Sequence, residues 1–305
     1  MKKRYTNDLK IWKSMTVEEM LKELSKGGFT ARRLGEAYLI WKKMLEDKKC
    51  TKILTVAGSL VPAGMRNIFV EIVKQKLIDI MIVTTGSILD HDLIEAFGVR
   101  HEQGELNTKD EVLASKNINR IYDVFLPNKG YIILEKKMKE LLPKIPQKEL
   151  SSREFFFNLG NLIKDKKSIL KNCSEMGIPI FDPGITDSMI GFHAWMYSQD
   201  HKLKVNPQLD IKEFLDLTWN KDRFGVVILG GGLPKHFSLA MLQVTGKKIA
   251  YGIQITMSRQ EYGGVSGASL EEAKSWKKIS KSALTVDVMC DVTIALPLLV
   301  ASLLK

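Results

Sequence analysis

The stretch Gly225-Val226-Val227-Ile228-Leu229-Gly230-Gly231-Gly232 decides the fold class, because a continuous apolar run passes straight into three glycines. An uninterrupted run of β-branched and aliphatic residues is typical of a strand buried on both faces, as in a parallel sheet. Glycines directly after such a strand let the chain turn sharply and let a ligand approach the backbone closely. We therefore expect a buried parallel strand that ends at a ligand-binding edge.

Similar short apolar runs alternate with helical patterns along the chain. Strands are predicted at 51–56, 78–84, 177–181, 225–229, 248–256 and 284–290, and helices at 30–45, 65–75 and 90–97. This alternation predicts a Rossmann-like α/β fold, a mostly parallel sheet with helices on both faces. Residues 1–26 are predicted to form an N-terminal arm, with a short helix opened by a capping box at Thr16 and Glu19. Residues 27–305 are predicted to form one large domain.

The net charge, the cysteine spacing and the length of the longest apolar stretch exclude several classes of protein. Net charge is +11 over 305 residues, but the lysines are spread along the chain and interleaved with acids, with no dense Arg-rich tract. We therefore expect mostly a solvated surface, with an anionic partner or cofactor as the second possibility, and no nucleic-acid partner. The cysteines Cys50, Cys173 and Cys290 are far apart, which indicates neither a disulfide framework nor a metal site. The longest apolar stretch, 293–304, contains Pro297 and is shorter than the ~20 residues of a membrane span. A cytoplasmic protein without membrane contact is expected.

Glycines and an acid recur just past predicted strands. Gly58, Gly86, Asp187 and the 230–232 triplet all occupy such positions. Ligands of parallel sheets bind beyond the carboxyl ends of the strands, so this recurrence predicts a nucleotide-type cofactor. Neither G-x-G-x-x-G nor G-x-x-x-x-G-K-[ST] is present, so the usual dinucleotide and P-loop fingerprints are absent.

The segment 271–279, EEAKSWKKI, carries the most distinctive chemistry. Trp276 stands among Lys274, Lys277, Lys278 and Lys281, with two acids just before. Nearby cations favour the neutral form of a lysine amine, which is the nucleophilic form, and an indole face attracts organic cations. These residues suit a site that handles a polyamine through a lysine imine; the alternative is an amphipathic surface helix with one buried Trp.

Histidines add one candidate for proton transfer. His236 follows the glycine triplet by four residues, so it is expected at the same edge of the sheet, where it could accept a proton from an amine. His193 is predicted to pack within a helix. His101 and His201 are predicted to be exposed.

With these residues in place, the chain resembles the deoxyhypusine synthase family in its archaeal or bacterial form. The matching segments keep the family order from about residue 27 to the end. They are GFTA (28–31), GSLVPAG (58–64), VTTG (83–86), NRI (119–121), PGITD (183–187), ILGGG (228–232), SGA (266–268), EAKSW (272–276) and Asp291 before LPLL (296–299).

The resemblance implies a Rossmann-like homotetramer that uses NAD. NAD takes hydride from spermidine, a lysine carries the four-carbon aminobutyl group as an imine, and the group moves to a lysine of the translation factor 5A precursor. Carried over residue by residue, the nucleophile is Lys278 and the proton-handling histidine is His236. The substrate-binding positions are Asp90, Glu272, Trp276 and Gly263. The NAD-binding positions are Gly58, Ser59, Leu60, Val61, Pro62, Thr85, Gly86, Ser87, Asp187, Gly231, Thr256, Asp291 and Val292.

Several positions depart from the family pattern. Lys277 stands where the family usually has Gly, and Phe192 and Val265 stand where the eukaryotic enzymes have acids. Ala240 replaces an asparagine, and His91 replaces a cofactor-contacting glutamate. The lost acids motivate an alternative, a related NAD-dependent enzyme that acts on small amines, as homospermidine-forming relatives do. A third possibility, a non-catalytic basic module that binds RNA or other anions, would need clustered Lys and Arg with exposed aromatics, a pattern that the sequence does not show.

Overall fold

The computed structural model describes residues 5–304, so the first four residues of the predicted arm lie outside the described residues. The chain forms two compact units. The first unit comprises residues up to 56, 77–79 and those from 215 onward; the second comprises 57–76 and 80–214. Helix α10 (Leu209–Trp219) runs across the boundary at 214.

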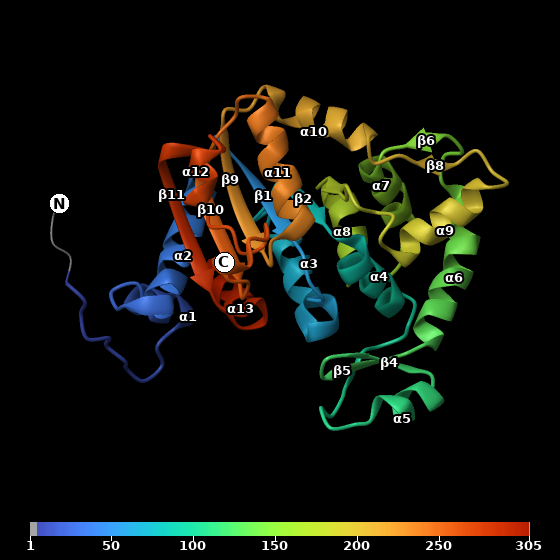
Figure 1. Ribbon diagram of the computed structural model, residues 1–305, viewed down its shortest axis with the longest axis horizontal. Helices are drawn as coiled ribbons and strands as arrows, with labels where there is room; N and C mark the ends of the chain where they lie inside the picture. Colours follow the sequence, from blue (N-terminus) through green and yellow to red (C-terminus); the bar gives the residue numbers. More distant parts are fainter. Residues whose placement is uncertain (1–4, 305) are drawn as a thin grey trace. The chain divides into compact units, whose positions relative to one another are not determined.

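The first unit is built on four parallel strands (Figure 1). Their order is β11-β10-β9-β1, and every neighbouring pair is parallel. Their bounds are β1 (Cys50–Val56), β9 (Arg223–Leu229), β10 (Ile249–Thr256) and β11 (Ile279–Met289). From Phe224 to Leu229 every residue of β9 is buried, as the opening apolar run predicts. The parallel sheet is therefore confirmed, although β11 begins five residues earlier than predicted.

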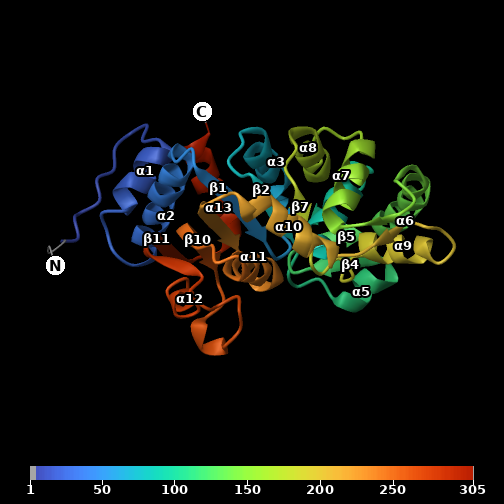
Figure 2. The same ribbon diagram turned by 90° about the horizontal axis from the view of Figure 1, so that it is seen from above.

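Helices cover both sides of these strands. They are α1 (Val17–Leu24), α2 (Phe29–Glu46), α11 (Gly232–Val244), α12 (Glu272–Ser275) and α13 (Val292–Leu303), with the short helical turn η3 (Gln260–Tyr262). Helix α2 packs on β10 and β11, and α11 packs on β1. Figure 2 shows α11 on the opposite side of the strands from α2 and α13. The predicted capping box is confirmed, because the Thr16 hydroxyl accepts from Glu19 N while the Glu19 carboxylate accepts from Thr16 N.

The second unit is richer in helices. Its parallel pair is β2 (Ile80–Val83) and β7 (Ile180–Phe181); β3 (Glu102–Gln103), β5 (Val124–Pro127) and β4 (Ile118–Ile121) form an antiparallel sheet, and β6 (Glu149–Leu150) pairs with β8 (Lys204–Val205). Its helices are α3 (Arg66–Lys74), α4 (Thr85–Ala96), α5 (Asp110–Ser115), α6 (Lys129–Leu141), α7 (Ser152–Leu162), α8 (Ile169–Met176) and α9 (Met189–Ser198), with short turns η1 (Val61–Met65) and η2 (Leu142–Lys144).

Two element starts in this unit were predicted wrongly by three residues or more. Strand β7 begins at Ile180, not at 177, because Gly177 forms the left-handed C-cap of α8. Helix α4 begins at Thr85, five residues before the predicted start at 90. The amides of Ser87 and Ile88 both donate to the Thr84 carbonyl, so the Thr-Gly-Ser turn is already helical. A glycine in the first turn hid this start, because glycine is a poor helix former.

Candidate active site

Three of the candidate cofactor positions lie at one edge of the first unit. Gly231 follows β9, Thr256 ends β10, and Asp291 follows β11. The register pairs Leu229 with Ile255 and Thr256 with Met289, so these carboxyl ends are level. The parallel strands therefore bring these three positions to one edge of the sheet.

Two of these side chains also have local structural roles. The Thr256 hydroxyl donates to the Gly230 carbonyl at 3.1 Å, which ties β10 to the glycine turn. Asp291 caps α13, because one carboxylate oxygen accepts from Thr293 N at 2.7 Å. The fold thus holds this edge in place through residues that the resemblance assigns to the cofactor.

Gly231 and Gly58 differ in the space that surrounds them. A Cβ on Gly231 would lie 2.6 Å from Ser266 Cα, so the close approach of loop 257–271 is what excludes a side chain there. Gly58 also has a positive φ, +101°, but nothing lies within 4 Å of its Cβ position. The turn at Gly58 therefore leaves space into which a ligand can approach the backbone, as a nucleotide requires.

Lys235, in the first turn of α11, is a functional candidate that sequence reasoning missed. Its side chain is only 3% exposed, and its ammonium donates to the carbonyls of Val265 and Ala268 at 2.7 and 2.5 Å. The pKa of Lys235 is lowered to about 8, chiefly by burial; the charges of Asp287 and Glu272 oppose the shift, and that of Lys278 adds to it. Nothing in the sequence separates this lysine from its many neighbours. His236, the next residue, is exposed.

The lysine-rich segment ends in a tight helical cap. Helix α12 has only one turn, and Lys277 N donates to Lys274 O while Lys278 N donates to Ala273 O. These two bonds form a Schellman motif, in which Lys277 takes the left-handed position with φ +58°. The glycine that the resemblance implies at this position would suit the left-handed conformation. Lys278 is held directly after this turn.

Trp276 and Lys278 lie together at the surface. The Lys278 ammonium lies 5.5 Å from the centroid of the Trp276 ring, and Trp276 is 60% exposed. The alternative of an amphipathic surface helix with one buried Trp is therefore wrong, because this Trp is exposed. Glu272 is also exposed, whereas Glu271 pairs with Lys274 at 2.6 Å. An indole face, an amine and a carboxylate are thus accessible within one short segment.

The backbone of Lys278 lies at the other end of the strands from Gly231, Thr256 and Asp291. Its carbonyl accepts from Ile249 N at 3.2 Å, at the start of β10, and it directly precedes β11. Loop 257–271, which contains Gly263, spans this distance: Ser266 Oγ accepts from Gly232 N at 3.0 Å near the glycine turn. The structure therefore groups the candidates of the first unit into an edge cluster and an α12 cluster, linked by this loop and by Lys235.

In the second unit, the predicted positions of α4 meet the turn that carries Asp187. A Cβ on Gly86 would lie 2.5 Å from the Asp187 carbonyl, and Thr85 N donates to Asp182 at 2.8 Å. The Ser87 hydroxyl bonds to Thr84 Oγ1 at 2.5 Å, and Asp187 itself is exposed. A free carboxylate beside a helix N-terminus suits the hydroxyl and phosphate groups of a dinucleotide.

Asp90 is buried and engaged by the backbone. Its two oxygens accept from Met189 N at 2.7 Å and Ile190 N at 3.0 Å, and it is 2% exposed. Burial raises the pKa of Asp90 to about 7, against the lowering by these two donors. It anchors the start of α9, a role that its assignment to substrate did not anticipate.

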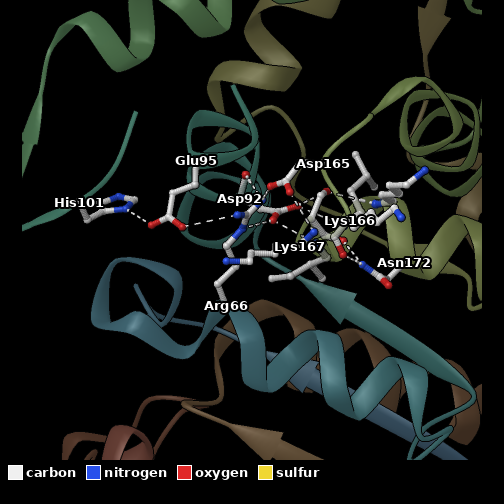
Figure 3. Close-up of polar contacts among 12 residues, drawn as sticks. Arg66, Asp92, Glu95, His101, Asp165, Lys166, Lys167 and Asn172 are labelled. Carbon is white, nitrogen blue, oxygen red and sulfur yellow. Dashed lines mark hydrogen bonds and ion pairs between the residues drawn. The ribbon is translucent and has the colours of Figure 1, made fainter. Parts of the chain in front are cut away.

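A charge network around Arg66 was also missed (Figure 3). Arg66 Nε lies 2.7 Å from Asp92, its Nη2 lies 2.8 Å from Asp165, and Nη1 lies 3.6 Å from Glu95. Asp92 also accepts from the Ser168 hydroxyl and from the amides of Ile169 and Leu170 at the start of α8. The network joins α3, α4 and α8 inside the second unit.

His101 and His91 extend this network. His101 bonds to Glu95 at 2.7 Å and to His91 at 2.9 Å, and its side chain is 5% exposed. The prediction that His101 is exposed is therefore wrong, because the turn after α4 folds it back onto the helix. Burial lowers the pKa of His91 to about 4, and the neighbouring His101 adds to the shift.

The positions that depart from the family are apolar and accessible. Phe192 and Val265 are 45% and 42% exposed. Asp182 is fully buried and accepts from Thr85 N and Gly184 N, so it cannot supply the missing charge at the surface. Tyr262 is exposed. No group of acids, histidines and cysteines that could hold a metal occurs among residues 5–304, and no helix in that range is long and apolar enough to cross a membrane.

Comparison with known proteins places these features in context. The family model for deoxyhypusine synthase matches residues 19–303. A probable deoxyhypusine synthase 1 of Methanosarcina mazei is 41% identical over 293 residues, which cover 96% of this chain and 92% of that protein. Another, from Archaeoglobus fulgidus, is 38% identical and covers 96% of both chains. A crystal structure assigned as a deoxyhypusine synthase of Entamoeba histolytica has a TM-score of 0.64 at 18% identity, covering 95% of this chain and 93% of that one, and supports the fold alone.

Proposed function

Because the chain belongs to the deoxyhypusine synthase family, a family of transferases, we propose that it transfers the aminobutyl group of spermidine, through an imine on Lys278, to a lysine of the translation factor 5A precursor. The observation that carries the proposal is the pairing of the half-buried Lys278 with the exposed Trp276, in which the ammonium lies 5.5 Å from the centroid of the indole ring. The family resemblance extends the proposal to a cytoplasmic homotetramer.

The chain's own residues supply a nucleophile, an aromatic face that binds cations and a proton acceptor. The Lys278 amine adds to the C=N carbon of the oxidised donor, and diaminopropane leaves with a proton as the lysine imine forms. The exposed Trp276 face holds a cationic amine by its quadrupole, and the exposed Glu272 carboxylate binds another. His236, exposed on α11, accepts the proton released by the attacking amine. The acceptor lysine then displaces Lys278 from the imine carbon.

The residues present fit NAD. Within the second unit taken by itself, the exposed turn at Gly58 and Ser59, followed by the buried Leu60, Val61 and Pro62, and the α4 start with the exposed Asp187 would suit NAD. Within the first unit taken by itself, Gly231, Thr256, Asp291 and Val292 would suit it. NAD, when bound, accepts hydride from the carbon beside the amine and returns it. Lys235 holds the loop between these positions and Lys278 through its bonds to Val265 and Ala268.

Trapping with borohydride tests the proposal. Purified protein with NAD and spermidine labelled in the aminobutyl group should give, after reduction, a labelled peptide modified at Lys278. Lys278→Arg keeps the charge but not the nucleophile, and should give none. Absence of any adduct at Lys278 with every donor tried would refute the mechanism.

A second candidate is transfer between small amines, and the exposed apolar Phe192 and Val265 favour it. Each lost charged contact to a fully cationic donor costs roughly 1.5–3 kcal/mol unless it is replaced. Adding the factor 5A precursor after the adduct has formed separates the two. Label that moves to the precursor lysine supports the first; label that moves only to putrescine or another small amine supports the second.

A further inference from the structure

The strands of the first unit carry a hollow of about 1410 Å³ at the end where they begin, which is the end opposite Gly231, Thr256 and Asp291. It lies where β1, β9 and β10 begin and where β11 is irregular between Ile279 and Leu284. None of the candidate active-site residues lines it. Its cationic lining residues are Lys48, Lys49, Lys52, Lys221, Arg223, Lys247 and Lys248, against the two acids Asp79 and Asp222.

These cations come from separate turns, which is why the sequence did not reveal the cluster. One group follows α2, one precedes β9 and one precedes β10. The parallel register aligns the starts of these strands, with Cys50 beside Arg223 and Phe224 beside Ile249. Lysines separated by more than 150 positions thereby converge on one surface.

Three of the seven cations are already neutralised. Lys52 pairs with Asp79 at 2.8 Å, Lys247 pairs with Asp222 at 2.9 Å, and Arg223 pairs with Asp47 while bonding to the Tyr251 hydroxyl. The other four form no ion pair within residues 5–304, and all four are exposed: Lys48, Lys49, Lys221 and Lys248. A lysine near a helix C-terminus complements the helix dipole. This effect explains one lysine at the end of each helix, but it does not explain why four unpaired lysines surround one hollow.

The rest of the lining indicates the class of ligand. Only Cys50, Ala250, Tyr251 and Leu284 are apolar, and Cys50 and Tyr251 are buried, whereas over half of a usual protein interface is apolar. Ser280, Ser282, Thr51 and Thr245 add hydroxyl donors. Tyr251 lies beneath the Arg223 guanidinium, 5.3 Å from it, so no exposed aromatic in the lining could stack on a base.

We propose that this hollow binds a chain of phosphates, either an oligophosphate or the backbone of a single-stranded nucleic acid, without reading bases. Hydroxyls and mobile ammonium groups suit phosphate oxygens, and the volume exceeds the roughly 300–1,000 Å³ of a usual small-molecule pocket. The site is independent of the proposed transferase activity, since the two share no residue.

Binding is measured by fluorescence anisotropy with a labelled 12-nucleotide RNA of mixed sequence. A Kd of about 1–100 µM at low salt is expected, falling in affinity as salt rises. The variant Lys48→Glu, Lys49→Glu, Lys221→Glu, Lys248→Glu should weaken binding at least 30-fold and reduce the salt slope by about 3, because each lost phosphate contact removes about 0.7.

The matched control carries the same charge change elsewhere. Lys109→Glu, Lys116→Glu, Lys129→Glu, Lys136→Glu alters four lysines of the second unit that are also exposed and free of ion pairs within the described residues. It should change the affinity less than threefold. Equal weakening by both variants would show a response to net charge alone and would overturn the site.

Competition separates the two phosphate sources. Displacement of RNA by inorganic tripolyphosphate at micromolar concentration supports an oligophosphate ligand, and binding of RNA alone supports a nucleic-acid backbone. If deca-glutamate displaces the RNA as effectively as tripolyphosphate does, the ligand is not specifically a phosphate chain. If neither RNA nor tripolyphosphate binds, the proposal is wrong. The pair Lys221→Glu, Lys248→Glu repeats the test with less perturbation, and the borohydride adduct at Lys278 should form equally in every variant.

Discussion

Helix α4 and the α12 segment, 271–278, are both rich in charged residues, but these are mostly buried in α4 and mostly exposed in the α12 segment. In α4 the charged side chains are buried and paired: Asp92 meets Arg66, and Asp90 holds the start of α9. In the α12 segment Glu272, Trp276 and Lys277 are exposed, and the Lys278 ammonium lies over the Trp276 indole, 5.5 Å from the ring centroid. Charge that the fold neutralises holds structure together, whereas charge left at the surface is available to a ligand.

The contrast has an energetic basis. Removing one member of a buried ion pair leaves the other charge without a partner in a medium that solvates it poorly. An exposed amine has water as its alternative partner, so it can be replaced with little effect on folding. Substitutions in α4 should therefore act on stability, and substitutions in the α12 segment should act on chemistry.

The largest difference between the effect on turnover and the effect on stability is expected at Lys278. Lys278→Met removes the nucleophile, so turnover should fall by about four orders of magnitude or more, which corresponds to about 5 kcal/mol of barrier. The unfolding free energy should change by less than about 0.5 kcal/mol, because the side chain is only half-buried and forms no ion pair within residues 5–304. Steady-state assays and urea unfolding measure the two. A large loss of stability would break the comparison.

The reverse pattern is expected at Asp92. Asp92→Asn leaves the Arg66 guanidinium buried without its main counter-charge and should cost about 3–4 kcal/mol of unfolding free energy. Asp110→Asn is the matched control, since Arg120 Nε lies 2.6 Å from Asp110 in the same geometry but Asp110 is 77% exposed. That change should cost less than about 1 kcal/mol. Similar losses in both variants would mean that burial does not set the difference.

Acid sensitivity tests the buried histidine of α4. The pKa of His91 is lowered from 6.5 to about 4, so between these values the unfolded chain binds a proton that the folded chain does not. The unfolding free energy should therefore fall as pH drops from 7 to 4, by about 3 kcal/mol from this group. His91→Gln should remove that part of the slope, and the exposed His201→Gln should not. Urea unfolding at several pH values checks this; an unchanged slope in His91→Gln would contradict it.

Local patterns allowed much of this molecule to be predicted. The parallel sheet followed from apolar runs such as 225–229, and the α1 cap followed from Thr16 and Glu19, because each depends on neighbours in sequence. The ion pairs of Arg66 could not be predicted, since its partners lie 26 and 99 positions away. For the same reason the burial of Lys235 and the convergence of lysines at the strand starts became visible only in three dimensions.

The smallest expected effect lies within the α12 segment itself. Lys277 holds φ +58°, a conformation that costs a non-glycine residue about 1–2 kcal/mol but costs glycine almost nothing. Part of that gain is lost because glycine has more freedom in the unfolded chain, so Lys277→Gly should raise the unfolding free energy by about 0.5–1 kcal/mol. Lys277→Ala keeps the Cβ and should give no gain. Adduct formation at Lys278 should persist in both variants, since the Schellman bonds that place Lys278 come from backbone amides. If glycine stabilised no more than alanine, the left-handed conformation of residue 277 would carry no strain that a glycine relieves.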